Sequence, residues 1–557
     1  MESYWEILLI FAVYWQSILI LKKYGILERF NISNHGPLLM IRTTKGQKFL
    51  DRVASAKSFW RLFGDAGIPV MLFGMFLMFA LIIFSDIAMV ASLYEQTTPV
   101  PSEMHELRNI FLIPGINEFI PVVWGIIGLI ITLVVHEFSH AIMSKAEDIK
   151  VKSMGLILVL IPIGGFAEPD EEQLFGKRDK HEGGKNEETS HQKTATRRQR
   201  VRILTAGVMA NFVTAFVAFV LFFIVIGSIA PVSNVVITDV VPGSPAADVG
   251  LTEMTVVTHI NDQKIENGSA FHMHIASLPF GEVFKLGIKK DGKTSEVLLM
   301  PDMKKNGIIS GVKFNEIVYG MPAEKAGLVG GTLITRIDDV QIYNTQDFFD
   351  FMANTTPDQE IIIHTLIADE EINYSITLAS NPSGGEKGFI GVSGFSTFFA
   401  SRSIGISLGE YPARELLHFL QMIPYMMTGV AGWIILLVLP FPNPFIGSFA
   451  GFNTSIYMFY EPIGWAVPLG VGVFWLANSL LWIGLINFYV GLFNCLPMLP
   501  LDGGHVFRDI LHSILARLFG KEERMGVIAG KVATGFAILM LASLVFMIIA
   551  PKLASGF

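Results

Sequence analysis

The stretch WGIIGLIITLVVHEFSHAI, residues 124–142, decides the fold, because it is an apolar run long enough to enter a lipid bilayer. Within it lies the pattern H-E-x-x-H, formed by His136, Glu137 and His140. Ionisable side chains inside a membrane helix are costly, so their presence predicts a functional site. The rest of the sequence has to explain why a metal-ligand pattern stands where lipid is expected.

The composition indicates a membrane protein with soluble parts. The chain has 557 residues, of which 51% are hydrophobic and only 16% are charged, and its mean hydropathy is +0.51. The net charge of −8 gives no reason to expect nucleic acid as a partner. The single cysteine, Cys495, excludes an intramolecular disulfide and any zinc site built from several cysteines.

A membrane span needs about 20 apolar residues. The runs that meet this length are roughly 5–21, 68–93, 120–144, 203–229, 418–440, 466–500 and 527–549. The first run has no basic leader and no small-residue cleavage site, so we expect it to be a retained anchor. Either 418–440 lies along or dips into the outer face, which we prefer, or 461–500 holds two short crossings. The count of spans is therefore about six to seven.

Basic residues set the expected orientation. They concentrate in the loops 22–67 and 145–202 and in the segment after residue 502, and the positive-inside rule places all three in the cytoplasm. The acidic block between about 230 and 417 then lies outside, and the cell membrane is the expected location. The charged stretch 170–200 lacks apolar periodicity and is expected to be a cytoplasmic loop.

The outer block contains an internal repeat. VPGSPAADVGLTEMTVVTHINDQKI (241–265) matches VYGMPAEKAGLVGGTLITRIDDVQI (318–342) at a constant offset, 322 − 245 = 77. In each copy Pro-Ala opens a short helix, Gly ends it, and alternating apolar residues predict the next strand. The pattern resembles a tandem pair of α+β PDZ domains over about 232–395. The resemblance implies peptide or C-terminal ligands bound at a sheet edge; a steric lid without a ligand stays open beside it.

The H-E-x-x-H pattern carries the chemistry. On a helix, His136 and His140 share one face, so both imidazoles can reach one ion. Zinc accepts two histidine nitrogens and needs a third protein ligand and an open position for water. Glu137 adjoins the first ligand and can accept a proton from that water. The cofactor that we expect is therefore Zn²⁺.

The third ligand is expected in LINFYVGLFNCLPMLPLDGGHVF, residues 485–507. Asp502 follows an apolar helix that prolines break within the membrane region, and a broken helix is tolerated only inside protein or beside water. Asn487 and Asn494 are seven apart and lie on one face of this helix. They bind the substrate backbone or an oxyanion, or they form interhelical hydrogen bonds, and both roles stay open.

Together these motifs resemble the site-2 protease family of intramembrane zinc metalloproteases. The shared features are H-E-x-x-H in one span, N-x-x-P-x-x-x-x-D-G in another, and PDZ domains between them. The resemblance implies zinc held by His136, His140 and Asp502, with Glu137 as the catalytic base. Asn494 matches the family's asparagine.

Two weaker elements match the same family. GLILVLIPIGGFAEPDEE (155–172) resembles a β-hairpin that re-enters the membrane near the active site, which implies that Gly164, Gly165 and Phe166 bind an extended substrate. AGVMANF (206–212) resembles the small-residue start of the next core helix, with Val208 where proline is common.

The expected fold is a polytopic α-helical membrane protein with an inserted PDZ pair and a re-entrant hairpin. The expected domains are 1–119, N-terminal accessory spans and loop; 120–230, first part of the catalytic core; 235–305 and 306–395, PDZ domains 1 and 2; 396–465, amphipathic or re-entrant connector; 466–510, second part of the core; and 511–557, C-terminal segment and span.

The expected function is hydrolysis of a peptide bond within single-span transmembrane substrates in the lipid bilayer. The outer PDZ pair would then act as a size filter or would capture a peptide. Two alternatives remain at this stage. One is an H-E-x-x-H membrane protease of another family, whose third ligand is a Glu. The other is a membrane scaffold without catalysis that binds partners through its PDZ pair.

Overall fold

The computed structural model describes residues 2–43, 47–95, 106–110, 113–159, 161–175, 194–278, 281–302, 307–367, 370–381, 387–442, 447–520 and 522–554. Most of the expected loop 170–200 lies outside these residues. By contact density the chain forms two compact units. The first comprises Met1–Phe223, Ile435–Gly451 and Leu476–Phe557, and the second comprises Ile224–Ile434 and Phe452–Trp475.

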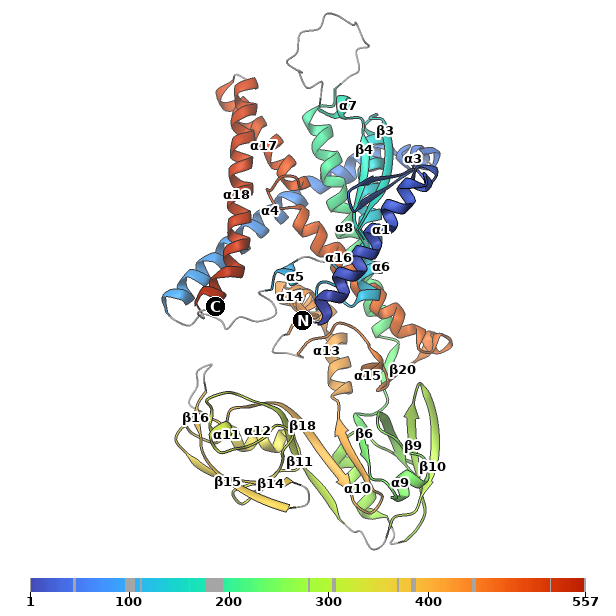
Figure 1. The fold of residues 1–557 in the computed structure, drawn as a ribbon, viewed down its shortest axis with the longest axis vertical. Helices are drawn as coiled ribbons and strands as arrows, with labels where there is room; N and C mark the ends of the chain where they lie inside the picture. Colours follow the sequence, from blue (N-terminus) through green and yellow to red (C-terminus); the bar gives the residue numbers. More distant parts are fainter. Residues whose placement is uncertain are drawn as a thin grey trace, which may run out of the picture. The chain divides into compact units, whose positions relative to one another are not determined.

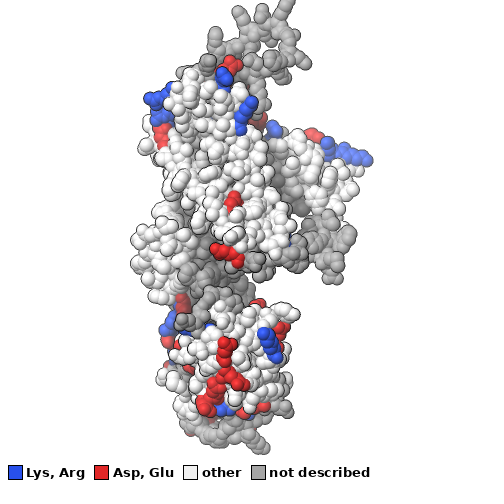
Figure 2. All heavy atoms as spheres, turned by 90° about the vertical axis from the view of Figure 1, so that its left-hand side faces the viewer, with Lys and Arg blue, Asp and Glu red and all other residues white. Residues whose placement is uncertain are grey.

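Among the described residues, five helices are long and apolar enough to cross a membrane. They are α4 (Lys57–Tyr94), α6 (Val122–Ala146), α8 (Arg197–Ile226), α16 (Gly472–Asn494) and α18 (Glu522–Ala554). Large apolar side chains point outward from them; Phe73, Phe76 and Phe84 of α4 are each about 70% exposed. Figure 2 shows such a face: the helical unit is largely white, and its Lys and Arg side chains gather toward one end. This pattern suits contact with lipid rather than water.

Two of the expected spans are not among these five helices. Residues 5–21 lie in a helix, α1 (Glu2–Lys23), but this helix is not among the five. The run 418–440 is divided between α13 (Ala413–Met426) and α14 (Val430–Val438), of 14 and 9 residues. Neither is long enough to cross a bilayer. This division agrees with a segment that lies along or dips into the membrane surface.

Glycines let the helices of the first unit approach closely. A Cβ on Gly128 of α6 would lie 2.7 Å from the carbonyl oxygen of Trp482 in α16. A Cβ on Gly67 of α4 would lie 3.2 Å from the backbone oxygen of Thr205 in α8. Small residues at such crossings are how membrane helices gain van der Waals contact. The first of these contacts holds α6 close against α16.

The expected hairpin at 155–172 is present as part of a larger sheet. Strands β3 (Val151–Val159) and β4 (Ile161–Pro169) pair antiparallel. Strands β1 (Ile32–His35) and β2 (Leu38–Thr43) extend them in the order β1-β2-β3-β4. The two added strands come from a segment that the sequence alone suggested only as a basic loop. Figure 1 shows this sheet beside α1 and α6.

The arginines after residue 196, which signalled orientation in the sequence, form ion pairs in the folded unit. Arg202 of α8 binds Asp65 of α4 at 2.6 Å and Glu147, at the end of α6, at 2.8 Å. Arg200 binds Asp509 at 2.9 Å; Asp509 lies in α17 (Asp502–Phe519). These pairs tie together the ends of the helices that carry the candidate site.

The second unit contains two β lobes that share one sheet. Its path is β10-β9-β7-β6-β19-β18-β11-β12-β14-β15, with β13 and β8 attached at the side. The strands of the first lobe are β6 (Val235–Val240), β7 (Thr255–Ile260), β8 (Gln263–Lys264), β9 (Phe284–Lys290) and β10 (Lys293–Leu299). Those of the second are β11 (Ile308–Ile317), β12 (Leu333–Ile337), β13 (Val340–Gln341), β14 (Glu360–Ile367) and β15 (Glu370–Thr377).

Each copy of the repeat forms the short helix and strand that the sequence predicted. The helices are α9 (Pro245–Asp248) and α11 (Pro322–Lys325), each with proline at its first turn. A longer helix follows later in each lobe, α10 (Gly268–Ser277) and α12 (Thr345–Ala353).

The lobes are nested rather than consecutive. A hairpin of β18 (Val392–Ser401) and β19 (Ile406–Glu410) follows the second lobe, and β19 pairs with β6 of the first. Phe399, Ile404, Ile406 and Leu408 are buried in the core of the first lobe. Residues beyond 395, expected in a connector, therefore complete the first lobe, because its sheet needs β19 as a neighbour for β6.

Candidate active site

The two histidines of the H-E-x-x-H pattern meet on one face of α6. Their Nε2 atoms lie 3.1 Å apart, and their rings are nearly perpendicular, with centroids 4.6 Å apart. A spacing of four residues in a helix places both side chains one turn apart on the same side. His136 is buried and His140 half-buried.

Asp502 joins them from a distant part of the chain. It is the first residue of α17, and its Oδ2 lies 3.2 Å from Nε2 of His136 and 3.2 Å from Nε2 of His140. The turn that leads into α17 is tightly packed: a Cβ on Gly503 would lie 2.5 Å from the carbonyl oxygen of Cys495. A glycine there lets the helix start turn the carboxylate toward α6.

These three side chains fit a tetrahedral zinc site. Bonds of about 2.0–2.1 Å to nitrogen and oxygen place the ligand atoms of such a site about 3.3–3.4 Å apart, close to the distances found here. Oδ2 of Asp502 is buried and accepts no hydrogen bond from any described residue. Two imidazoles and one carboxylate are the donor set that leaves a fourth position for water. Among the described residues this is the one cluster with metal-ligand spacing.

Groups on α8 orient both imidazoles. Nδ1 of His140 lies 2.7 Å from the carbonyl oxygen of Ile203. Nδ1 of His136 lies 3.2 Å from the side-chain amide of Asn211. A neutral histidine that offers Nε2 to a metal carries its proton on Nδ1, so each Nδ1 needs an acceptor.

The amide of Asn211 supplies that acceptor when its oxygen faces the ring. As placed, Nδ2 is the amide atom next to the ring, and Oδ1 is buried without a hydrogen-bond partner among the described residues. The two ends of an asparagine amide are distinguished only by their hydrogen-bond network. With His136 as a metal ligand through Nε2, the network is satisfied when Nδ1 of His136 donates to Oδ1 of Asn211.

Glu137 lies between the histidines and the strand β4. Its Oε2 accepts a hydrogen bond of 2.7 Å from the backbone N–H of Ala167. A Cβ on Gly165 would lie 2.5 Å from Cγ of Glu137, so only glycine lets the strand pass this close. Gly164, Gly165 and Phe166 all lie in β4 and are half-buried.

The two asparagines of α16 make different contacts from those expected. The side-chain nitrogen of Asn487 donates to the carbonyl oxygen of Ile483 at 2.8 Å, and that of Asn494 donates to Val490 at 3.1 Å. Both described contacts lie within their own helix. The structure therefore does not bring either asparagine into contact with the three ligand side chains, and their roles toward substrate stay predictions.

Three features of the site were not identified from the sequence. They are Asn211, the carbonyl of Ile203, and Gly207, where a Cβ would lie 2.6 Å from Nε2 of His140. All three lie in α8. The small-residue stretch AGVMANF at 206–212 contains Gly207 and Asn211. The motif therefore pointed to this part of the chain, but nothing in it indicated that these residues contact the two histidines.

Three side chains with metal-ligand spacing, held among the apolar helices of an integral membrane protein, are typical of one class of proteins, the membrane metallohydrolases. The chain matches the model of peptidase family M50 over residues 124–542. It therefore belongs to peptidase family M50, the site-2 protease family, which confirms the resemblance.

Individual relatives agree with this membership. Protease RseP of Yersinia pestis is 23% identical over 424 residues, which cover 68% of this chain and 88% of the relative. A Clostridium acetobutylicum protein named as a zinc metalloprotease is 24% identical over 204 residues, 34% of this chain and 56% of the relative. The uncharacterized protein MJ0971 of Methanocaldococcus jannaschii is 29% identical over 192 residues, 34% of this chain and 44% of the relative.

Proposed function

We propose that this protein is an intramembrane zinc metalloendopeptidase that hydrolyses a peptide bond within transmembrane segments of single-span membrane proteins, as in regulated intramembrane proteolysis. The observation that carries the proposal is the convergence of His136, His140 and Asp502 within an apolar helical unit, with Glu137 beside them. Family membership supports this proposal over a scaffold without catalysis and over a protease with a Glu ligand.

The residues present divide the chemistry between them. His136, His140 and Asp502 would hold the zinc ion, which supplies Lewis acidity and lowers the pKa of water to about 7 in well-studied sites. Glu137 accepts the proton that the attacking water loses and passes it to the leaving amine. The N–H of Ala167 fixes one oxygen of this carboxylate, which holds the base at a constant distance from the histidines.

Strand β4 is suited to hold the substrate. It pairs with β3 on one side and lies at the end of its sheet, beside Glu137 on α6. A helical substrate must unwind locally because its carbonyls are hydrogen-bonded within the helix. The unwound segment would pair with β4 along Gly164, Gly165 and Phe166, in the manner of strand addition to a sheet edge.

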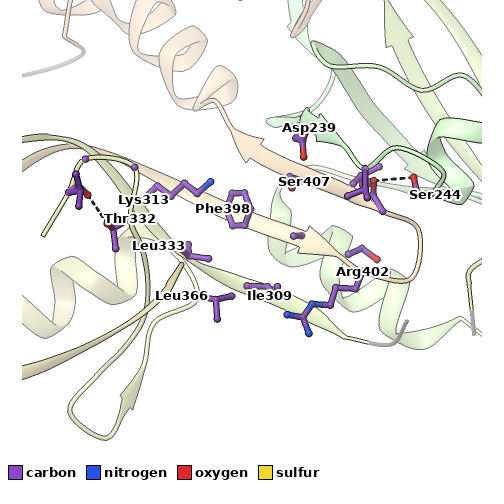
Figure 3. Close-up of a pocket in the computed structure, with 18 of the residues that line it drawn as sticks. Asp239, Ser244, Ile309, Lys313, Thr332, Leu333, Leu366, Phe398, Arg402 and Ser407 are labelled. Atoms are coloured by element: carbon purple, nitrogen blue, oxygen red, sulfur yellow. Dashed lines mark hydrogen bonds between the residues drawn. The ribbon is translucent and has the colours of Figure 1, made fainter. Parts of the chain in front are cut away.

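The two β lobes would act outside the membrane as a PDZ pair that either excludes bulky substrates or captures a peptide. A cavity of about 1120 Å³ lies between them. Figure 3 shows Lys313, Phe398 and Arg402 around this cavity. The basic loops support an active site near the cytoplasmic side of what we propose is the cell membrane.

The decisive test compares the wild-type protein with Glu137→Gln on a panel of single-span reporter proteins in detergent. We expect the variant to keep one equivalent of zinc and to lose cleavage by about 10²–10⁴-fold. Asp502→Ala should lose the metal as well, because one of three protein ligands is gone. Cleavage that survives in Glu137→Gln would refute the proposed base, and zinc that survives in Asp502→Ala would refute the proposed ligand set.

A further inference from the structure

A second, shorter repeat closes both β lobes in the same way. FIGVS at 389–393 matches SIGIS at 403–407. The carbonyl oxygen of Gly405 accepts a hydrogen bond of 2.9 Å from the N–H of Val241, and that of Gly391 accepts one of 2.9 Å from Val318. The two donors are separated by the offset of the long repeat, 318 − 241 = 77. The strand that follows Gly391 in the second lobe therefore corresponds to the strand that follows Gly405 in the first.

The first lobe has a strand bound along this closing strand. Residues Phe398–Ser401 of β18 pair antiparallel with Ile406–Gly409 of β19. Phe399 enters the core of the first lobe and is only 2% exposed. A Cβ on Gly268, the first residue of α10, would lie 2.0 Å from the ring of Phe399. The groove between β19 and α10 is thus filled by the chain itself.

The matching strand edge of the second lobe is unpaired in the described part of the chain. Residues 392–397 of β18, except Gly394, pair with β11 on one side, whereas the pairing with β19 on the other side begins only at Phe398. An unpaired strand edge offers a row of backbone donors and acceptors to another chain. The second lobe therefore has an unpaired strand edge at the position where the first lobe pairs with residues Phe398–Ser401.

An aromatic wall borders this open edge. The ring of Phe395 in β18 lies 4.8 Å from that of Phe348 and 5.1 Å from that of Phe349 in α12. Phe348 corresponds to Phe271 of the first lobe (348 − 271 = 77), and both are buried. Phe349 corresponds to His272 (349 − 272 = 77), and its side chain is 48% exposed. Phe349 thus exposes apolar surface beside this strand edge, where the first lobe has a histidine.

We propose that an extended peptide segment with a large apolar residue binds antiparallel along residues 392–397 of β18, beside α12, and that the first lobe takes no such ligand because β18 already occupies it. The inference rests on the peptide-capture role proposed for the β unit and assigns that role to one lobe. The segment Phe398–Ser401, which is paired with the first lobe, is the model for this ligand. It indicates that a short internal segment with one buried aromatic side chain is enough for binding.

The first test measures binding to full-length protein in detergent, with Glu137→Gln to prevent cleavage. The probe is a fluorescent peptide of sequence STFFAS, copied from residues 396–401, acetylated and amidated at its ends. Phe349→Asp should weaken binding at least tenfold, because it places a charge in the apolar wall. His272→Asp, the matched change in the filled lobe, should alter binding less than twofold.

The second test fixes the register by disulfide trapping. Ser393 and Ser407 are equivalent in the short repeat, and Ser407 pairs with Ala400 in the filled lobe. A peptide STFFCS should therefore cross-link to Ser393→Cys and not to Ser407→Cys. The natural Cys495 is buried and does not compete.

The outcomes separate the inference from the function on which it rests. Binding that Phe349→Asp leaves unchanged, or equal trapping at positions 393 and 407, would overturn the assignment to the second lobe while peptide capture stands. No binding of the probe to any variant would overturn peptide capture as well. Neither result tests the proposed proteolysis, which the panel of reporter proteins measures separately.

Discussion

At the scale of single residues, the site depends on groups that surround the ligands as much as on the ligands. His136 and His140 come from one helix, but the acceptors for their Nδ1 atoms come from another. An imidazole with a fixed tautomer and a fixed ring plane offers Nε2 without loss of rotational freedom. Asn211 is therefore a positioning residue for His136.

Replacing Asn211 tests this role. Asn211→Leu should lower zinc affinity about 10–100-fold, the usual cost of losing such a partner, whereas Asn211→Asp keeps an acceptor and should retain most of it. Chelator competition on the purified protein measures the affinity without any assay of cleavage. Asn487→Leu is the control, because Asn487 bonds only within its own helix among the described residues. Equal affinities in Asn211→Leu and Asn487→Leu would contradict the role.

Gly207 makes a second residue-scale prediction. The Cβ of Gly207→Ala would lie within 2.8 Å of both ligand rings, so the rings must move and zinc content should fall at least several-fold. Gly530→Ala on α18 is the matched change, since a Cβ there meets nothing within 4 Å and alanine favours helix. Metal analysis of both variants after gel filtration measures their zinc content. Unchanged zinc content in Gly207→Ala would contradict the prediction and would mean that α8 moves to make room for the methyl group.

At the scale of elements, strands recruited from far along the chain complete two separate sheets. β2 adds to β3 with apolar cross-strand pairs such as Leu39 and Leu158, and β19 adds to β6. Each recruited strand shields an edge that would otherwise be open. Among the strand edges that stay unpaired in the described sheets, the edge of β4 beside α6 and the edge of β18 at 392–397 are the two proposed binding sites.

We expect the stability of strand β19 to depend on pH. Burial raises the pKa of Glu410 above its ordinary value of 4.5, although the N–H of Gly268 donates to its carboxylate. The folded state thus holds the proton more tightly than the unfolded state, so this contribution to stability is present at low pH and is lost as pH rises through the raised pKa. In the Glu410→Gln variant, the backbone amides of β19 should exchange with solvent more slowly than in the wild type at neutral pH, but not below pH 4.5. Hydrogen–deuterium exchange at matched pH measures it, and a difference that does not grow with pH would contradict the assignment.

At the scale of the whole molecule, the two nested β lobes of the second unit form an insertion whose ends meet. The N–H of Tyr411 donates to the carbonyl oxygen of Asn234 at 2.8 Å, so the chain enters and leaves the nested lobes at one place. An insertion with adjoining ends can be removed with little strain on the remainder. The proposed catalysis in the membrane and the proposed recognition by the lobes should therefore be separable by an excision that ends at these two residues.

Excision tests this separation and the role of the lobes. Removing 235–410, with a short linker between Asn234 and Tyr411, should leave a folded protein that binds zinc. Removing 235–395 should give an aggregating protein, because Ile404, Ile406 and Leu408 lose the core that buries them. Gel filtration and zinc content compare the two; equal behaviour would contradict the nested arrangement.

The same excised protein distinguishes the two proposed outer roles. If the lobes exclude bulky substrates, removing 235–410 should extend cleavage to single-span reporters with large ectodomains. If the lobes capture peptides, cleavage of all reporters should fall instead. Reporters that differ only in ectodomain size, assayed side by side, give the answer.

The sequence by itself determined the local features of this protein. Apolar length predicted the five long helices, the spacing of His136 and His140 predicted a shared face, and the 77-residue offset predicted two similar lobes. Each of these follows from period or composition within a few turns of chain, where the physics is local. The resemblance to site-2 proteases rested on such motifs, and the family match confirms it.

Only the tertiary structure decided which distant segments meet. Asp502 lies 502 − 136 = 366 residues from His136, and their contact depends on how the intervening chain brings the start of α17 to α6. The pairing of β19 with β6, the addition of β2 to β3, and the approach of Asn211 to His136 are likewise long-range. No period within a segment encodes such contacts, because they are selected by the burial of whole faces and by the close packing that glycines such as Gly207 and Gly503 permit.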